Sequence, residues 1–179
     1  MKGFFVLFWR YIEDKLAENA KMSDSKMSMD SKDREIIREL QTDGRMSNQE
    51  LAAKVNLSPS PCLRRLRNLE NEGIIKGYGV EVDAQAYGLP ITVFARVELD
   101  KHSADVVSNF EQHIEFAEQV LECYVMTGVS DYLLKIVVAD LHAYEVFVRK
   151  VLHPIGSIAS IDTSFAYATV KKTGIFPRI

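Results

Sequence analysis

The sequence contains few cysteines and no regular spacing of metal ligands. Its 179 residues include two cysteines, Cys62 and Cys123, which lie far apart and form no Cys-x-x-Cys pair. A disulfide framework is therefore excluded, and a reducing compartment is the default. The four histidines are scattered without the short spacings of a zinc site, so we expect neither a metal ion nor another cofactor.

Long hydrophobic runs are also missing. The apolar stretch near the amino terminus covers only residues 3–9, whereas a helix that crosses a bilayer needs about 20 apolar residues. Charged residues follow it directly, and no small-residue cleavage site of a signal peptide appears. We therefore expect no membrane partner, and we interpret residues 1–29 as a dispensable leader with alternative starts at Met22, Met27 and Met29.

An excess of basic residues is absent as well. The formal net charge is −3, which argues against a protein that is basic everywhere. The charge is nevertheless segregated: residues 31–79 hold nine Lys/Arg against seven Asp/Glu, and residues 80–179 hold eight against thirteen. The first segment carries +2 and the second −5, as expected where one part of a chain meets an anion and the other does not.

What the sequence does contain begins with two short helical patterns. Asp30 or Ser31 can cap a first helix. Ser47 and Glu50 have the spacing of a capping box for a second helix. Asn56 tolerates the left-handed conformation that ends a helix in a tight turn. The apolar residues that recur at helical spacing are Ile36, Ile37, Leu40, Leu51, Ala52 and Val55.

A third helix starts with two prolines, Pro59 and Pro61. If Ser58 is the N-cap, both fall in the first turn, where a missing N–H donor costs little. We expect the Ser58 hydroxyl to accept a hydrogen bond from a first-turn amide, and other amides of that turn to hold a phosphate. Gly73 ends the helix, and residues 74–82 have the composition of a strand.

On a helical wheel, the third helix separates an apolar side from a basic one. The apolar side consists of Cys62, Leu63, Leu66 and Leu69. Guanidinium and amide groups on the other sides match guanine, adenine and phosphate. The candidate DNA-contacting residues are Ser58, Ser60, Pro61, Arg64, Arg65, Arg67, Asn68 and Lys76. These elements predict a winged helix-turn-helix over residues 30–79, with double-stranded DNA as its partner.

Residues 90–179 predict a second domain of different type. Their pattern is strand, helix, strand, strand, helix and strand (90–99, from 103, 120–127, 132–138, from 140 and 158–170). This order is that of a ferredoxin-like βαββαβ sandwich, with both helices on one face of an antiparallel sheet. The other face would be a large apolar patch, so we expect it to meet a second copy of the chain. The fold class is α+β, with a hinge at residues 80–89.

Together these motifs resemble the Lrp/AsnC, or feast/famine, family of transcriptional regulators. The resemblance is carried by residues 30–78, 122–138 and 169–177, and it covers about residues 29–179. It implies an N-terminal DNA-binding domain and a ferredoxin-like effector domain. It also implies homodimers that assemble into octamers, and a free amino acid bound between dimers.

The resemblance further implies roles for individual residues. Arg65 and Arg67 match the family pattern, and Arg64 and Asn68 lie where members vary, which suits residues that read bases. Arg65 is common to members with different operators, so it implies a phosphate contact or a structural one.

The effector-binding residues that the resemblance implies are Thr127, Gly128, Val129, Ser130, Asp131 and Tyr132. The family's T-G-D-Y-D stretch corresponds to residues 127–131, where Val129 and Ser130 replace an acidic and an aromatic residue. Backbone amides of this loop can still hold an α-carboxylate, and Asp131 an α-amine.

We interpret the chain as a sequence-specific DNA-binding transcriptional regulator that responds to an amino acid, located in the cytoplasm on the nucleoid. An architectural DNA-compacting protein and a metabolite-binding module without promoter specificity are the alternatives. We do not expect an enzyme, because no carboxylate pair, Ser/His/Asp set or phosphate loop is present. Asp131 with a nearby histidine would be the only catalytic candidate.

Overall fold

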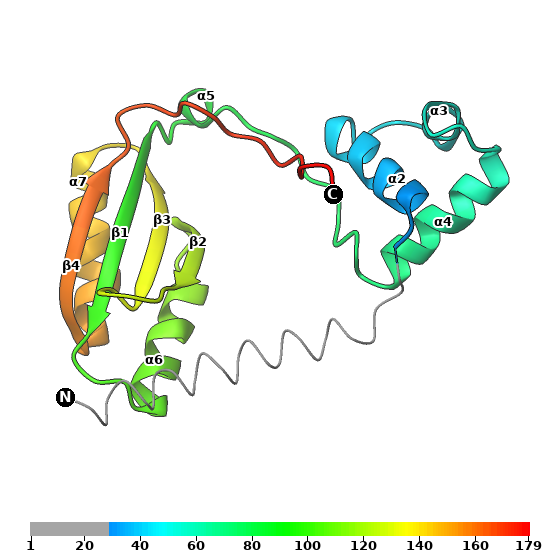
Figure 1. Ribbon diagram of the computed structural model, residues 1–179. Coiled ribbons are helices and arrows are strands. Elements are labelled where there is room, and N and C mark those ends of the chain that lie inside the picture. The colour runs from blue at the N-terminus through cyan, green and yellow to red at the C-terminus, as the bar shows by residue number, and fades with distance from the viewer. Residues whose placement is uncertain (1–28) are drawn as a thin grey trace. The chain divides into compact units, whose positions relative to one another are not determined.

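The computed structural model describes residues 29–179, which form two compact units (Figure 1). The helical unit comprises residues 29–81 together with residues 171–179, and the sheet unit comprises residues 82–170. The sequence-based boundaries instead assigned the last residues to the C-terminal domain. The expected leader lies outside the described residues, apart from Met29.

Three helices build the helical unit. They are α2 (Ser31–Thr42), α3 (Asn48–Lys54) and α4 (Pro59–Asn71). Asp30 is the N-cap of α2 and forms a reciprocal capping box with Asp33. Ser47 and Glu50 form the predicted capping box of α3. Capping satisfies backbone N–H groups that have no partner within the helix, which fixes where each helix begins.

The turn between α3 and α4 has the predicted conformation. Asn56 adopts a left-handed φ of 54°, and the Leu57 N–H donates to Ala52 O at 2.9 Å. This turn lets all three helices contribute to one apolar core. Its fully buried members are Ile36, Leu51, Ala52, Val55, Cys62 and Leu69.

Residues 74–82 do not form the predicted strand. They follow α4 directly, in the position of a wing, but no strand of the helical unit lies beside them to supply backbone partners. The hydrogen bonds of a strand are made to a neighbouring strand. An apolar segment with high β-propensity therefore does not form a strand when no partner strand lies beside it. Val80 is accordingly 88% exposed.

The sheet unit confirms the βαββαβ prediction. After a short helix α5 (Ala84–Tyr87), the elements are β1 (Ile91–Leu99), α6 (Ala104–Glu115), β2 (Val120–Val125), β3 (Tyr132–Val138), α7 (Leu141–Phe147) and β4 (Ile158–Phe165). All pairings are antiparallel, and the strand order is β2-β3-β1-β4. From the apolar residues Leu141, Tyr144, Phe147, Val148 and Val151 we expect the second helix to extend to Val151. Instead, α7 ends at Phe147 and passes into a π-helix, η1 (Val148–Leu152), and a 3-10 turn, η2 (His153–Ile155).

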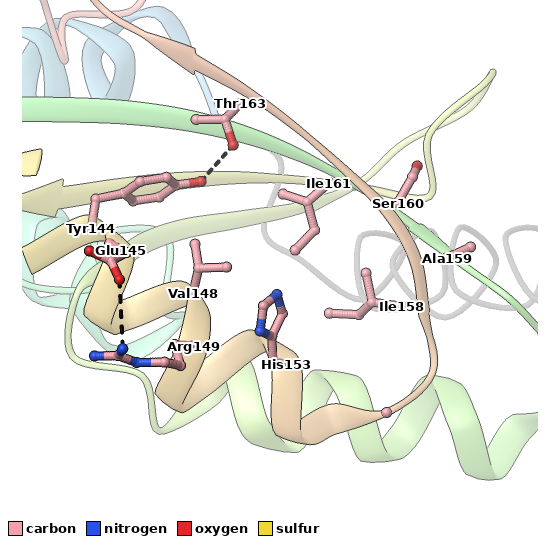
Figure 2. A pocket seen from close by; sticks show the side chains of 11 residues that line it. Tyr144, Glu145, Val148, Arg149, His153, Ile158, Ala159, Ser160, Ile161 and Thr163 are labelled. Carbon is pink, nitrogen blue, oxygen red and sulfur yellow. Dashed lines mark hydrogen bonds and ion pairs between the residues drawn. The ribbon is translucent and has the colours of Figure 1, made fainter. Parts of the chain in front are cut away.

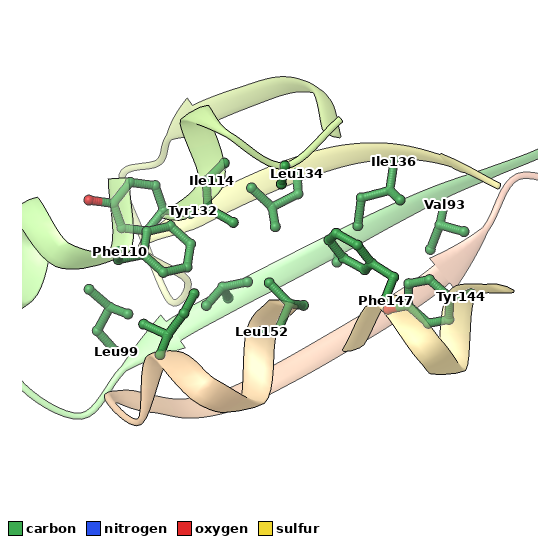
Figure 3. Packing of buried hydrophobic residues seen from close by; sticks show 14 of the residues in the cluster. Val93, Leu99, Phe110, Ile114, Tyr132, Leu134, Ile136, Tyr144, Phe147 and Leu152 are labelled. Atoms are coloured by element: carbon green, nitrogen blue, oxygen red, sulfur yellow. The ribbon is translucent and has the colours of Figure 1, made fainter. Parts of the chain in front are cut away.

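One face of this sheet packs against the helices (Figure 3). Alternate residues of β1 and β3 meet Phe110 of α6 and Phe147 of α7 in one apolar core. The strand residues in this core are Val93, Ala95, Val97, Leu99, Tyr132, Leu134, Ile136 and Val138. In β1 the buried residues alternate with less buried ones, as expected for a strand with one face on a core.

The opposite face of the sheet carries apolar and charged side chains together. Phe94 is half-buried, and Tyr124 is 50% exposed. Ion pairs cross neighbouring strands on this face: Arg96 lies 3.2 Å from Asp162, and Lys135 lies 2.6 Å from Glu122. None of the helices within residues 29–179 has the length and apolar character needed to span a membrane.

Candidate DNA-binding helix and effector loop

The prolines leave the first turn of α4 with few donors. Ser58 is the N-cap, but its side chain makes no capping hydrogen bond. Pro61 occupies the third helical position and has no N–H to offer a capping oxygen. The prediction of a Ser58 side-chain cap is therefore wrong. The turn is held instead by Asn48 of α3, whose Nδ2 donates to Pro59 O at 2.9 Å.

Helix α4 buries one side and exposes the other. Cys62 and Leu69 are fully buried, and Leu66 packs against the same core, whereas Leu63 is only half-buried. The exposed candidate residues are Ser58, Ser60, Pro61, Arg64, Arg67, Asn68 and Lys76. Arg67 and Asn68 lie three and four residues after Arg64, so each of them neighbours Arg64 on the exposed side of the helix.

The Arg65 side chain is directed toward the start of α2 rather than toward solvent. Its Nη1 lies 2.8 Å from Asp30 Oδ2 and 2.8 Å from Asp33 Oδ1, and the Asp33 side chain is 4% exposed. Hydrogen bonds to Asp33 and Asp30 raise the pKa of the Arg65 guanidinium. The pKa of Asp30 lies below its usual value, chiefly because its carboxylate accepts the Asp33 backbone N–H. The geometry favours the structural one of the two roles expected for Arg65.

A contact that the sequence did not reveal holds the segment after α4. The Tyr78 hydroxyl donates to Glu70 Oε1 at 2.8 Å. Burial of the phenol, together with this hydrogen bond, raises the pKa of Tyr78 to about 12. Gly73 provides the left-handed φ of 64° at which the chain leaves the helix. This link positions the backbone around Lys76 against the end of α4.

The predicted effector loop connects β2 to β3. The Met126 N–H donates to Asp131 O at 2.8 Å, and the Asp131 N–H donates to Val97 O at 2.9 Å, which anchors the loop to β1. Between these anchors, Thr127, Gly128 and Val129 are exposed, and Ser130 is half-buried.

Asp131 itself is turned into the protein. Its Oδ2 accepts the Leu99 N–H at 2.7 Å, and its Oδ1 lies 2.6 Å from His102 Nε2. The side chains of His102 and Asp131 are only 7% and 10% exposed. The structure thus places a histidine beside Asp131, which the sequence alone did not reveal. These two interactions link the loop to the end of β1 and to the segment that precedes α6.

Tyr132 is buried as well. It is 1% exposed, its ring centroid lies 4.4 Å from that of Phe110, and its hydroxyl donates to Glu111 Oε1 at 3.1 Å. Of the six predicted effector residues, therefore, Thr127 to Val129 are exposed, Ser130 is half-buried, and Asp131 and Tyr132 are buried.

A separate groove of about 720 Å³ runs along the edge strand β4 (Figure 2). Its floor is apolar, with Val148 of η1 facing Ile158 and Ile161 of β4. Tyr144 hydrogen-bonds Thr163 at 2.7 Å, and Arg149 lies 3.6 Å from Glu145. None of the predicted effector residues lines this groove.

Comparison with known proteins identifies the family. A family model described as winged helix-turn-helix DNA-binding matches residues 29–76, and one described as the Lrp/AsnC ligand binding domain matches residues 92–176. The Bkd operon transcriptional regulator of Pseudomonas aeruginosa is 42% identical over 142 residues, covering 79% of this chain and 93% of that relative. The chain belongs to the Lrp/AsnC family of transcriptional regulators.

Other relatives of this Lrp/AsnC chain are similarly complete. The leucine-responsive regulatory protein of Escherichia coli is 36% identical over 156 residues, covering 85% of this chain and 95% of the relative. Among solved structures, a Neisseria meningitidis transcriptional regulator in complex with L-Met has a TM-score of 0.80 at 34% identity, covering 84% of this chain and 97% of that one. An AsnC family regulator of Agrobacterium tumefaciens also reaches 0.80 at 34% identity, covering 83% and 97%.

Proposed function

We propose that this Lrp/AsnC chain is a sequence-specific transcriptional regulator that binds duplex DNA through α4 and responds to an amino acid. The observation that carries the proposal is the division of α4. Its apolar side is fixed in the core by Cys62 and Leu69, while Arg64, Arg67 and Asn68 are exposed on one face. A helix held rigidly in this way can enter a major groove without a further loss of conformational entropy.

Within α4, Arg64 and Asn68 are the base-reading residues. An arginine fork matches guanine O6 and N7, and an asparagine amide matches adenine N6 and N7. Arg67 and Lys76 supply phosphate contacts, together with the polar groups of the first turn around Ser60. The +2 charge of residues 31–79 favours this polyanionic partner.

The effector site is the exposed part of the loop at residues 127–130. Its backbone amides can donate to an α-carboxylate, while Asp131 and Tyr132 keep the loop in place. A relative in the same family was solved with L-Met, which supports a free amino acid as the ligand class. Val129 and Ser130 depart from the family pattern in this loop, so the screen of all twenty amino acids has to identify which side chain it selects.

The assembly we propose is a homodimer formed through the uncovered sheet face, with dimers associating into an octamer. Phe94, Tyr124 and Leu133 are apolar groups on that face, and the flanking ion pairs can fix its register. The measurement is light scattering of the full chain at several concentrations. A monomer at micromolar concentration would contradict the proposed dimer.

Two experiments test the function. Footprinting on promoter fragments should show protection confined to a few sites, and evenly spread protection would indicate an architectural protein instead. A thermal-shift screen of the twenty amino acids should reveal the effector, because ligand stabilisation follows RT ln(1 + [L]/Kd) and is visible at large excess. No shift with any amino acid, and no promoter retardation at low salt, would refute the proposal.

A further inference from the structure

The C-terminal residues pack on α2, although the two segments lie far apart in the sequence. Strand β4 ends at Phe165, yet residues 171–179 belong to the helical unit. The Gln41 Nε2 donates to Gly174 O at 2.7 Å, and Gln41 Oε1 accepts the Phe176 N–H at 3.1 Å. Arg38 Nη1 adds a third hydrogen bond, to Phe176 O at 3.0 Å.

This contact has the pattern of a specific but reversible interaction. The side-chain amide of Gln41 both donates to and accepts from the tail backbone, as a neighbouring strand would. Lys172 adds an ion pair to Glu81 at 3.1 Å. Phe176 remains 71% exposed, so burial of apolar surface contributes little.

The packing beneath the tail is also incomplete. A cleft of about 550 Å³ lies between Phe176–Ile179 and the surface of α2 and α3. Its apolar wall includes Met29, Ile37 and Val55. The tail therefore lies on this surface without sealing it, which suits a contact that forms and releases.

We propose that residues 171–179 act as a latch: docked on α2, they tie the DNA-binding unit to the effector unit through a second chain segment. The first connection is the segment predicted to be a hinge, residues 80–89, and the second is the stretch that continues from β4 into the latch. A unit held by one hinge reorients freely, whereas closing a second connection restricts it.

The latch also gives the effector response a route to DNA, a consequence that rests on the proposed function. Ligand-dependent movement of β4 is passed to α2 while the latch is docked, and not after its release. An effector shifts this balance only if it binds the docked and released states with different affinity.

The test uses the full chain and three variants. Gln41 is half-buried, and Gln41→Ala removes two of the three hydrogen bonds between α2 side chains and the tail backbone. A truncation after Thr173 removes the docked residues themselves. Gln119→Ala is the matched control, because Gln119 is exposed in the sheet unit and its contact is made by the backbone.

Hydrogen exchange tests the docking itself. Peptides covering residues 171–179 should exchange about 2–10-fold faster in Gln41→Ala than in the wild type or Gln119→Ala, since the lost hydrogen bonds are exposed ones. Equal exchange in all three proteins would overturn the docking.

Nitrogen-15 relaxation tests the second connection. In Gln41→Ala and in the truncation, the helical unit should tumble with a shorter correlation time than the sheet unit. In the wild type, the correlation times of the two units should be more nearly equal. The same ratio in every protein would overturn the latch, whatever the protein does with DNA.

Operator affinity with and without L-methionine or L-leucine tests the consequence. An allosteric response is on the order of 5–150-fold, and we expect it to fall below about 2-fold without the latch. An unchanged response in Gln41→Ala would overturn the coupling. If the wild type does not respond to any of the twenty amino acids, the proposed function fails, and the relaxation result still decides the latch.

Discussion

Replacing Arg65 by alanine separates a structural arginine from one that reads DNA. In the wild type, one guanidinium nitrogen of Arg65 contacts both Asp30 and Asp33 at 2.8 Å. After Arg65→Ala, the buried Asp33 carboxylate keeps only the Asp30 N–H, which it accepts through Oδ2 at 3.1 Å. Asp30 is half exposed and can be solvated by water, so the cost falls on Asp33.

The magnitude follows from this loss. A buried group that loses a hydrogen-bonding partner costs about 1–3 kcal/mol, and a charged one lies toward the upper end. For a domain of 60–100 residues, each kcal/mol lowers the Tm by about 4–8 °C. We therefore expect the transition of the helical unit to fall by on the order of 10 °C. The affinity of the folded protein for DNA at low temperature should change by less than about threefold.

Scanning calorimetry and operator titration at two salt concentrations measure these quantities, and Arg64→Ala is the matched control. Arg64 is exposed and forms no ion pair with any residue in the range 29–179, so its removal should leave the Tm within about 1–2 °C. It should weaken specific binding by about 1–3 kcal/mol and relax sequence preference. If Arg65→Ala kept its Tm but weakened all DNA binding and lowered the salt slope, Arg65 would be a phosphate contact.

Three further predictions concern single side chains. Tyr78 should ionise near pH 12 rather than 10, so its contribution to stability is present below pH 10 and lost as pH rises through about 12. The difference in phenolate absorbance between the wild type and Tyr78→Phe measures this ionisation. A difference centred at pH 10 would contradict the prediction. Asp131→Asn should lower stability by about 1–3 kcal/mol in chemical denaturation, whereas lost amino-acid binding at unchanged stability would mean that the carboxylate contacts the ligand. Leu69→Ala should cost about 2–5 kcal/mol, and a smaller loss would show that α4 can repack.

Much of the fold could be predicted because the relevant signals are local. The cap of α2 at Asp30, the capping box at Ser47, the left-handed Asn56 and the alternation of β1 each depend on residues a few positions apart. The predictions that failed depended on groups that the local pattern does not supply. The segment at 74–82 needed a partner strand, and the Ser58 cap needed an amide that Pro61 does not have.

The candidate site divides in the same way. Helical periodicity showed that Arg64 and Asn68 lie opposite the buried side of α4, and the structure finds them exposed. On a helical wheel Arg65 falls between the apolar and the exposed side of α4, where solvent, a phosphate and another helix are equally compatible. Only the approach of α2 brings Asp33 within 2.8 Å of it.

The amino-acid sequence was enough to predict the βαββαβ order of the sheet unit, the N-terminal caps of α2 and α3, and the exposure of Arg64 and Asn68 on α4. These follow from propensities and periodicities that act within one or two turns of chain. The tertiary structure decided the partners of Arg65 and Asp131 and the return of the C-terminal tail to Gln41, 133 residues from Gly174. Such contacts join segments whose separation in sequence carries no information on distance, and they are fixed only when both cores close.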